Sequence, residues 1–162
     1  MEFKRLDLRI MKSWRIGRII RLAIFTAIAA GGTGLLTLVE MEGIWLTIVT
    51  IALWALPAYA FIGFLLYPPI EYRQWGYYID EEKVVIKHGL FFIKQTIIPI
   101  IRIQNITMSQ GPINRKLGLY SVEMALASGS FDIPGLDKET AEHLSESLKS
   151  KLYLRIEQKG VL

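Results

Sequence analysis

The sequence LAIFTAIAAGGTGLLTLV, at residues 22–39, contains 18 consecutive residues without a charged side chain. A second stretch, GIWLTIVTIALWALPAYAFIGFLLY at residues 43–67, contains 25 uncharged residues. As α-helices these stretches would be about 27 and 37 Å long, and the hydrocarbon core of a bilayer is about 30 Å thick. Both stretches are therefore predicted to be transmembrane helices.

The segments around these helices predict how the chain lies in the membrane. Residues 40–43 leave room for only a tight turn, so the two helices should be antiparallel neighbours. Residues 1–21 form a basic juxtamembrane segment with seven Lys or Arg residues, whereas the turn has none. Because basic residues stay on the cytoplasmic side, we expect a multi-pass protein of the inner (cytoplasmic) membrane, with the N-terminus and residues 71–162 in the cytoplasm.

Three other interpretations of these segments are less favoured. A cleaved signal peptide would explain the basic start and the small residues at Ala27-Ile28-Ala29, but the apolar run continues and a second span follows. A buried helical hairpin of a soluble protein would not need two uncharged runs of this length. Binding of nucleic acid is disfavoured because the basic block lies directly against an apolar run.

The basic segment itself allows two interpretations. Phe3, Leu6, Ile10 and Trp14 recur at helical spacing, which predicts an amphipathic helix lying in the membrane interface. Alternatively, the basic residues only set the topology of the spans. On the first interpretation, seven residues are candidate contacts for anionic membrane lipids: Lys4, Arg5, Arg9, Lys12, Arg15, Arg18 and Arg21.

The first span carries small residues at four-residue spacing, and such residues let another helix approach closely. The favoured interpretation is that they pack against the second span of the same chain. The alternative is that they pack against a helix of a partner subunit or of a second copy. This small-residue stripe consists of Ala23, Ala27, Ala30, Gly31 and Gly34.

Residues 71–162 have the composition of an ordinary soluble domain, with 12 Lys or Arg and 11 Asp or Glu. The chain contains no cysteine, so a disulfide framework is excluded. Runs of β-formers between turn signals predict six short strands, and a periodic apolar pattern predicts a final amphipathic helix with Asp137 as its N-cap. The expected strands cover residues 72–79, 83–88, 91–98, 102–108, 120–127 and 131–133, with one helical turn at residues 113–117.

This order of elements predicts a membrane α-hairpin followed by a mainly β (α+β) domain. One apolar stripe of the final helix, made by Ala141, Leu144, Leu148, Leu152 and Ile156, can close one open end of a curled antiparallel sheet.

Several segments of this domain carry a family likeness. They are Trp75–Tyr77, Val84–Leu90, Ile98–Ile106, Ser109–Leu119 and Ile133–Leu136. With the two spans before them, they resemble the YdbS-like membrane proteins that contain a bacterial pleckstrin-homology (PH) domain of type 2. The likeness covers essentially the whole chain.

The resemblance implies a PH-like fold, that is, a strongly bent antiparallel barrel capped by a C-terminal helix. It also implies a non-enzymatic role at the bacterial inner membrane, in envelope stress or defence, beside a larger membrane protein with related PH-like domains or by self-association. A full PH barrel has seven strands, so the seventh is either hidden within residues 120–133 or absent. The acidic turn at residues 80–82 would repel a phosphate group, so inositol-lipid binding is not carried over.

The polar residues provide no catalytic constellation, and we expect no enzyme activity, no cofactor and no metal site. His88 and His143 lie far apart and lack the ligand spacing of a metal site. A polar cluster in and after the fourth strand is a candidate docking surface for a partner domain or an anionic membrane, unless it only caps loops and barrel edges. It contains Arg102, Gln104, Asn105, Gln110, Asn114, Arg115 and Lys116.

The sequence therefore predicts a non-catalytic, membrane-anchored interaction or scaffold subunit that assembles with another membrane protein through its PH-like domain. The alternative is a sensor of anionic lipid surfaces that uses the basic N-terminus and the PH-like domain.

Overall fold

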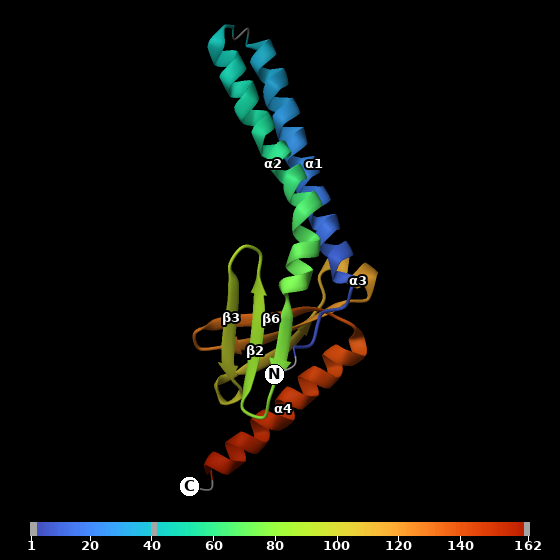
Figure 1. The fold of residues 1–162 in the computed structure, drawn as a ribbon, viewed down its shortest axis with the longest axis vertical. Coiled ribbons are helices and arrows are strands. Elements are labelled where there is room, and N and C mark those ends of the chain that lie inside the picture. The colour runs from blue at the N-terminus through green and yellow to red at the C-terminus, as the bar shows by residue number, and fades with distance from the viewer. Residues whose placement is uncertain (1–2, 40–41, 161–162) are drawn as a thin grey trace. The chain divides into compact units, whose positions relative to one another are not determined.

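The computed structural model of the chain describes residues 3–39 and 42–160, and it divides the chain into two compact units. One unit is a helical hairpin over Trp14–Pro69, and the other combines Met1–Ser13 with Ile70–Leu162. Figure 1 shows the elements of both units.

The hairpin is built by α1 (Ile10–Leu38) and α2 (Ile44–Gln74). Only 6% and 11% of the residues in their most apolar windows are buried. An apolar surface this extensive would not stay in water, so the two helices are the membrane spans. The predicted spans at residues 22–39 and 43–67 coincide largely with α1 and α2, but α1 already begins at Ile10 and α2 continues to Gln74. Residues 40 and 41 of the predicted turn lie outside the described residues.

A single face of α1 packs against α2. Ala29 has no exposed surface, a Cβ added at Gly32 would lie 3.0 Å from a methyl group of Leu53, and the indole nitrogen of Trp54 donates to the hydroxyl of Thr33 at 3.3 Å. Small residues at this face let the two helices approach closely.

The small-residue stripe lies elsewhere on α1, so its favoured interpretation was wrong. A Cβ added at Gly31 or Gly34 would meet nothing within 4 Å. The physical reason is that the helix repeat places Ala29 and Gly32 on one side of α1 and the stripe on another. All five members of the stripe are exposed: Ala23, Ala27, Ala30, Gly31 and Gly34.

The soluble unit contains two three-stranded antiparallel sheets and a long C-terminal helix, as the PH-like prediction requires. The first sheet has the order β1-β2-β3 and the second the order β4-β5-β6. A core of buried aliphatic side chains lies between the elements, with Val84, Ile98, Val122, Ile133 and Leu148 at or below 1% exposure. The elements are β1 (Gly76–Ile79), β2 (Lys83–Gly89), β3 (Ile93–Pro99), the 3-10 helix η1 (Ile100–Arg102), β4 (Asn105–Ser109), α3 (Pro112–Leu117), β5 (Tyr120–Leu126), β6 (Gly129–Leu136) and α4 (Lys138–Gly160).

Six strands were predicted, and six are found in the described residues. Most boundaries differ by one to four residues, and three differences are the largest. The fourth strand begins at Asn105 rather than at residue 102, because Ile100–Arg102 form the 3-10 helix η1. The first strand begins at Gly76 rather than at residue 72, because residues 72–74 form the last turn of α2. The last strand continues to Leu136 rather than ending at Ile133, because Gly135 adopts a positive φ of 66° that carries the chain past Pro134.

The C-terminal helix begins and packs as expected. The carboxylate of Asp137 accepts hydrogen bonds from the backbone nitrogen of Thr140 at 2.9 Å and from its hydroxyl at 2.7 Å, and these bonds lower the pKa of Asp137. Ala141, Leu144 and Leu148 are buried in the core. Leu152 is half-buried, and the side chain of Ile156 lies outside the described residues.

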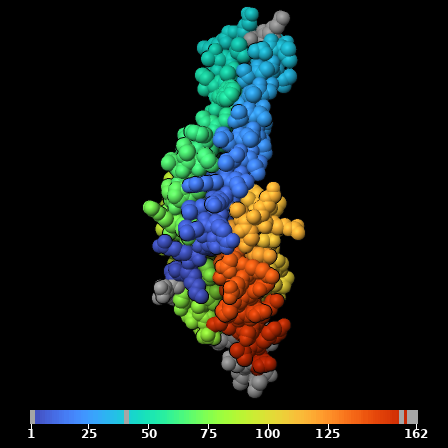
Figure 2. Space-filling model, turned by 90° about the vertical axis from the view of Figure 1, so that its right-hand side faces the viewer, coloured from blue at the N-terminus to red at the C-terminus, as the bar shows by residue number. Residues whose placement is uncertain are grey.

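The first residues of the chain are part of the soluble domain, and the interfacial helix expected to begin at Phe3 is not formed. Lys4 and Tyr77 exchange two backbone hydrogen bonds of 2.8 and 3.0 Å as an isolated antiparallel bridge. The side chains of Leu6 and Ile10 are 4% and 1% exposed. These apolar residues fill the core of the domain instead of a membrane surface, which is why residues 3–9 are not helical. Figure 2 shows this segment in dark blue, between green and orange parts of the chain.

An ion pair within this N-terminal segment, defined here as residues 3–13, fixes its turn. The carboxylate of Asp7 accepts hydrogen bonds from the backbone nitrogen, Nε and Nη2 of Arg9, at 2.8, 3.0 and 2.8 Å. These bonds lower the pKa of the Asp7 carboxyl below 3.8. Arg9 also donates to the carbonyl of Leu117 at 3.2 Å, and the Ser13 hydroxyl donates to the side-chain oxygen of Asn114 at 2.6 Å. The N-terminal segment is therefore tied to α3.

Replacing Gly135 should loosen the N-terminal segment. A Cβ at this position would lie 2.7 Å from two side-chain atoms of Ile10, at a positive φ. We expect Gly135→Ala to lower the free energy of unfolding of the domain by about 1–3 kcal/mol and to speed tryptic cleavage after Arg5. Gly129→Ala is the matched control, because Gly129 also has a positive φ but has open space around it. Equal thermal stability and equal cleavage of the two variants would contradict the packing described.

The docking of the N-terminal segment should depend on pH through Asp7. Because the pKa of Asp7 is lower in the folded state than its ordinary value of 3.8, its contribution to stability is present above that value and is lost as the pH falls through the folded pKa. We expect Asp7→Asn to reduce stability by about 0.2–1 kcal/mol at neutral pH. The difference from the wild type should vanish in acid, in thermal unfolding of the full chain in detergent. Asp132→Asn, which removes an exposed carboxylate of β6 outside the N-terminal segment, serves as the control. An equal loss of stability at neutral pH in the two variants would contradict the role of Asp7.

Candidate functional site

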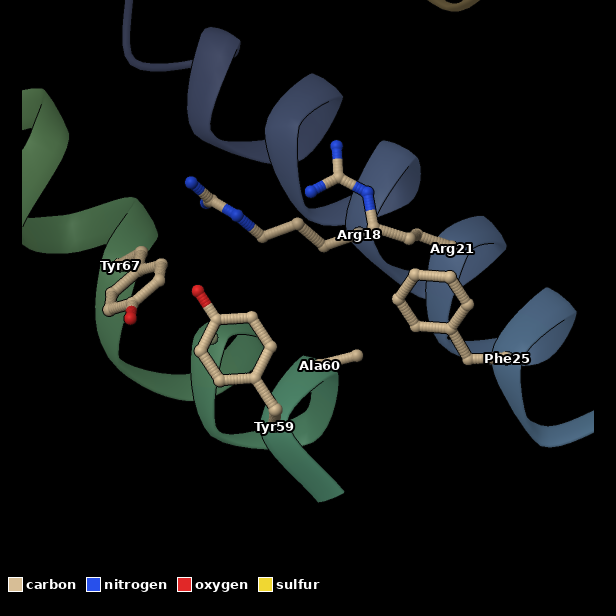
Figure 3. A pocket seen from close by; sticks show the side chains of 7 residues that line it. Arg18, Arg21, Phe25, Tyr59, Ala60 and Tyr67 are labelled. Atoms are coloured by element: carbon tan, nitrogen blue, oxygen red, sulfur yellow. The ribbon is translucent and has the colours of Figure 1, made fainter. Parts of the chain in front are cut away.

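A cavity of about 180 Å³ lies between α1 and α2 at the basic end of the hairpin. Arg18 and Arg21 reach it from α1, and Tyr59 and Tyr67 reach it from α2. Figure 3 shows the side chain of Arg18 extending across to α2, toward the rings of the two tyrosines. Phe25, Ala60 and Gly63 complete the lining, so one end of the cavity is basic and the other is apolar.

The position of each residue follows from the helix repeat and the antiparallel hairpin. Arg18, Arg21 and Phe25 are spaced by three and four residues, and Tyr59, Gly63 and Tyr67 are each four residues apart, so each set lies along one side of its helix. Because the helices are antiparallel, the start of α1 meets the end of α2. The two sets therefore face each other at the end of the spans where the sequence becomes charged.

Arg18 is held over an aromatic ring at this site. Its guanidinium carbon lies 5.8 Å from the centre of the Tyr67 ring, which is the range of a cation–π contact. A Cβ added at Gly63 would lie 3.3 Å from the same ring, so glycine gives Tyr67 the space for this position. An arginine anchored in this way keeps its charge at a defined place between the helices.

The chemistry of the cavity suits a small anionic group with an apolar extension. Arginine binds phosphate through several N–H donors, and tyrosine hydroxyls add further donors. The cavity is smaller than typical small-molecule sites, which begin at roughly 300 Å³, and it therefore fits a single phosphate-sized group rather than a cofactor. Within the described residues, no group of three or more His, Cys, Asp or Glu side chains could hold a metal ion.

The predicted anionic-lipid contacts do not all lie in one place. Arg18 and Arg21 line the cavity between the spans, whereas Arg9 is bound to Asp7 and Leu117 within the soluble domain. Lys4 takes part in the backbone bridge to Tyr77 and has an exposed side chain. The remaining members, Arg5, Lys12 and Arg15, are exposed.

The predicted docking cluster is divided between the two ends of β4. Arg102, Gln104 and Asn105 are exposed where β4 begins. At the other end, the side-chain nitrogen of Gln110 donates to the carbonyl of Leu119 at 3.0 Å, and Asn114 accepts the bond from Ser13. Gln110 and Asn114 therefore stabilise loops. Arg115 and Lys116 are exposed on α3. They lie beyond the end of β4, whereas Arg102, Gln104 and Asn105 lie at its start.

The sequence interpretation missed the tyrosines of the cavity and a polar hollow on the second sheet. Ser109, Ser121, Glu123, Ser130 and Asp132, with Phe131, line this hollow of about 310 Å³. The tyrosines could have been found by pairing the first turns of one predicted span with the last turns of the other. The hollow follows from the register of β4, β5 and β6, which the sequence does not reveal.

The comparisons with known proteins agree with this architecture. The family model described as "Bacterial PH domain" matches residues 15–152. The chain is similar to the transmembrane protein YdbS of Bacillus subtilis (strain 168), with 28% identity over 138 residues that cover 85% of each chain. No solved structure matches the chain. The chain therefore belongs to the bacterial PH domain family, as a YdbS-like membrane protein in which two spans accompany a PH-like domain.

Proposed function

We propose that this chain is a non-catalytic, membrane-anchored assembly module, whose first span binds a transmembrane helix of another membrane protein or of a second copy. The observation that carries this proposal is the outward position of the small-residue stripe on α1. Ala29 and Gly32 already serve the contact with α2, so a separate face of small residues is available for another helix.

The physical argument concerns helix contacts in lipid. A lipid-facing surface needs only apolar side chains, and large ones such as Ile24 and Ile28, at 52% and 55% exposure, satisfy this need. Small residues at four-residue spacing have a different effect, because they lower the distance at which two helix backbones meet and so increase their van der Waals contact. Ala27 and Gly31 lie at this spacing on the exposed side of α1.

The PH-like domain extends the assembly surface into the cytoplasm. The excess of Lys and Arg before the first span supports a cytoplasmic position of both termini at the inner membrane. On the domain, the exposed members of the docking cluster supply polar contacts for a partner's soluble domain: Arg102, Gln104, Asn105, Arg115 and Lys116.

Enlarging the stripe should weaken the assembly. We expect Ala27→Leu with Gly31→Leu to destabilise the association by about 1–2 kcal/mol, measured as loss of the co-purified partner, or of energy transfer between labelled copies, in mild detergent. Ile24→Leu with Ile28→Leu is the control, because it changes exposed apolar residues of the same helix outside the stripe. Association that is equally stable in both double variants would refute the role of the stripe.

A second candidate function, sensing of anionic lipid, is favoured by the cavity at the basic end of the hairpin. Arg18 and Arg21 lie at the charged end of the spans, which is the level expected for lipid phosphates. Phe25, Ala60 and Gly63 give the cavity an apolar lining beside these arginines. On this proposal, a lipid phosphate binds between the helices and changes how tightly they pack.

Neutralising the two arginines should reduce lipid binding. We expect Arg18→Gln with Arg21→Gln to weaken retention of phosphatidylglycerol by about 1 kcal/mol per arginine, measured by native mass spectrometry of the protein released from mixed-lipid nanodiscs. The matched control is Arg15→Gln, which removes an exposed charge from the same helix outside the cavity. If the control loses as much phosphatidylglycerol per charge as the double variant, the cavity is not the binding site.

A further inference from the structure

The turn between β2 and β3 presents an unusual group of exposed apolar side chains. Phe91, Phe92 and Ile93 are 78%, 90% and 55% exposed, and Leu90 before them is partly exposed. Residues 90–93 are called the apolar tip below. Hairpin turns are usually polar and rich in Gly, Asn or Asp, so two adjacent phenylalanines at the end of a hairpin need an explanation.

The backbone holds the apolar tip in a tight turn. A Cβ added at Gly89 would overlap the backbone of Phe92 and Ile93, so this close approach requires glycine. Gly89 and Ile93 are also register partners at the end of the β2–β3 ladder. The tip is therefore the turn of a regular hairpin, in which β2 and β3 are paired at seven positions.

The strand register places the apolar tip at a specific end of the first sheet. Gly76, where the chain enters β1 from α2, pairs with Lys87. The hairpin continues beyond Lys87 through His88 and Gly89 to the tip, about 10 Å or more at the rise of a strand. The tip therefore projects past the point where the chain enters the first sheet.

The length of chain between the span and the sheet fits this projection. The uncharged stretch ends at Tyr67, and residues 68–75 separate it from Gly76. As a helix these residues extend about 12 Å, which is close to the length by which the tip projects beyond Gly76. A connection of this length is short enough for the tip to reach the bilayer surface.

The residues beside the tip suit a membrane interface. The ring of Trp75 stacks on His88 with centres 6.0 Å apart, and tryptophan favours the level of lipid headgroups. His88 pairs with Lys94 across the hairpin, and Lys94 is exposed. Lysine next to an apolar anchor is attracted to anionic headgroups.

We propose that the apolar tip inserts into the acyl boundary of the same membrane that holds the two spans, with Trp75 and Lys94 at the headgroup level. The tip is then a second attachment of the PH-like domain, in addition to its covalent connection to the helices. It fixes which side of the domain faces the bilayer. This inference does not depend on the assembly role of α1, since it concerns a contact with lipid alone.

A fluorescent label at position 92 tests the insertion. The chain has no cysteine, so Phe92→Cys gives a single labelling site in the full chain, with an environment-sensitive NBD group as the probe. Glu82→Cys is the matched control, because Glu82 is an exposed residue of the turn at the opposite end of the same sheet. Both labelled chains are reconstituted into phosphatidylcholine–phosphatidylglycerol vesicles, with and without brominated acyl chains.

If the tip inserts, the label at position 92 should emit at a shorter wavelength than the label at position 82. Brominated lipid should quench most of the emission at position 92 and leave the emission at position 82 unchanged. Equal emission and equal quenching at the two positions would overturn it. Shielding of position 92 without quenching by brominated lipid would also overturn it and would identify a protein occupant. Dilution of the protein in lipid then distinguishes the two protein occupants. Shielding of the label by a second copy is lost on dilution, whereas shielding by an intramolecular contact is not.

Discussion

The PH-like domain depends on a contact within it between the residues before the first span and the residues after the second span. Before the first span, Leu6 and Ile10 are buried in the core of the domain. After the second span, the hydroxyl of Tyr72 donates to the carbonyl of Leu6 at 2.9 Å. The chain therefore leaves the domain and returns to it at sites joined by a direct hydrogen bond. A domain that contained only the residues after the second span would lack Leu6 and Ile10 in its core, so the N-terminal segment contributes to the stability of the domain.

Most elements could be predicted from the sequence because they follow from local patterns. Two long uncharged runs identify the spans, and turn signals separate the six strands. The N-terminal segment could not be predicted in the same way. Its apolar residues Phe3, Leu6 and Ile10 fit a helical repeat. No neighbouring residue in the sequence indicates whether they pack against a membrane surface or into a protein core. Ile10 packs against Gly135, which is distant in the sequence and has no side chain, so that space is left for Ile10.

The candidate site shows the same limit. Sequence spacing identified small residues on the first span, but this span has small residues on two of its faces. Either face could pack against the second span. The choice of Ala29 and Gly32 depends on Leu53 and Trp54 across the interface, which a search for spacing does not consider. Arg18 and Arg21 were recognised as charges, whereas their arrangement with Tyr59 and Tyr67 depends on the antiparallel pairing of α1 with α2.

The two sheets of the domain have different outer surfaces, although both follow the alternation of strand side chains. In the second sheet, Glu123 pairs with Asp132 on the outer face, while Val122 and Ile133 point to the core. This is the pattern of a sheet with one face in water.

In the first sheet, Val84 and Ile98 are paired and buried in the core, but their neighbours Val85 and Ile97, paired on the other face, are apolar as well. Val85 is only 1% exposed, so it is covered within the chain, whereas Ile97 on β3 is 59% exposed. Burial of the exposed apolar area of Ile97 would be stabilising at about 25 cal/mol per Å². The two sheets therefore differ. The outer face of the second sheet is polar, whereas the first sheet carries apolar side chains on both faces, with Val85 buried and Ile97 exposed.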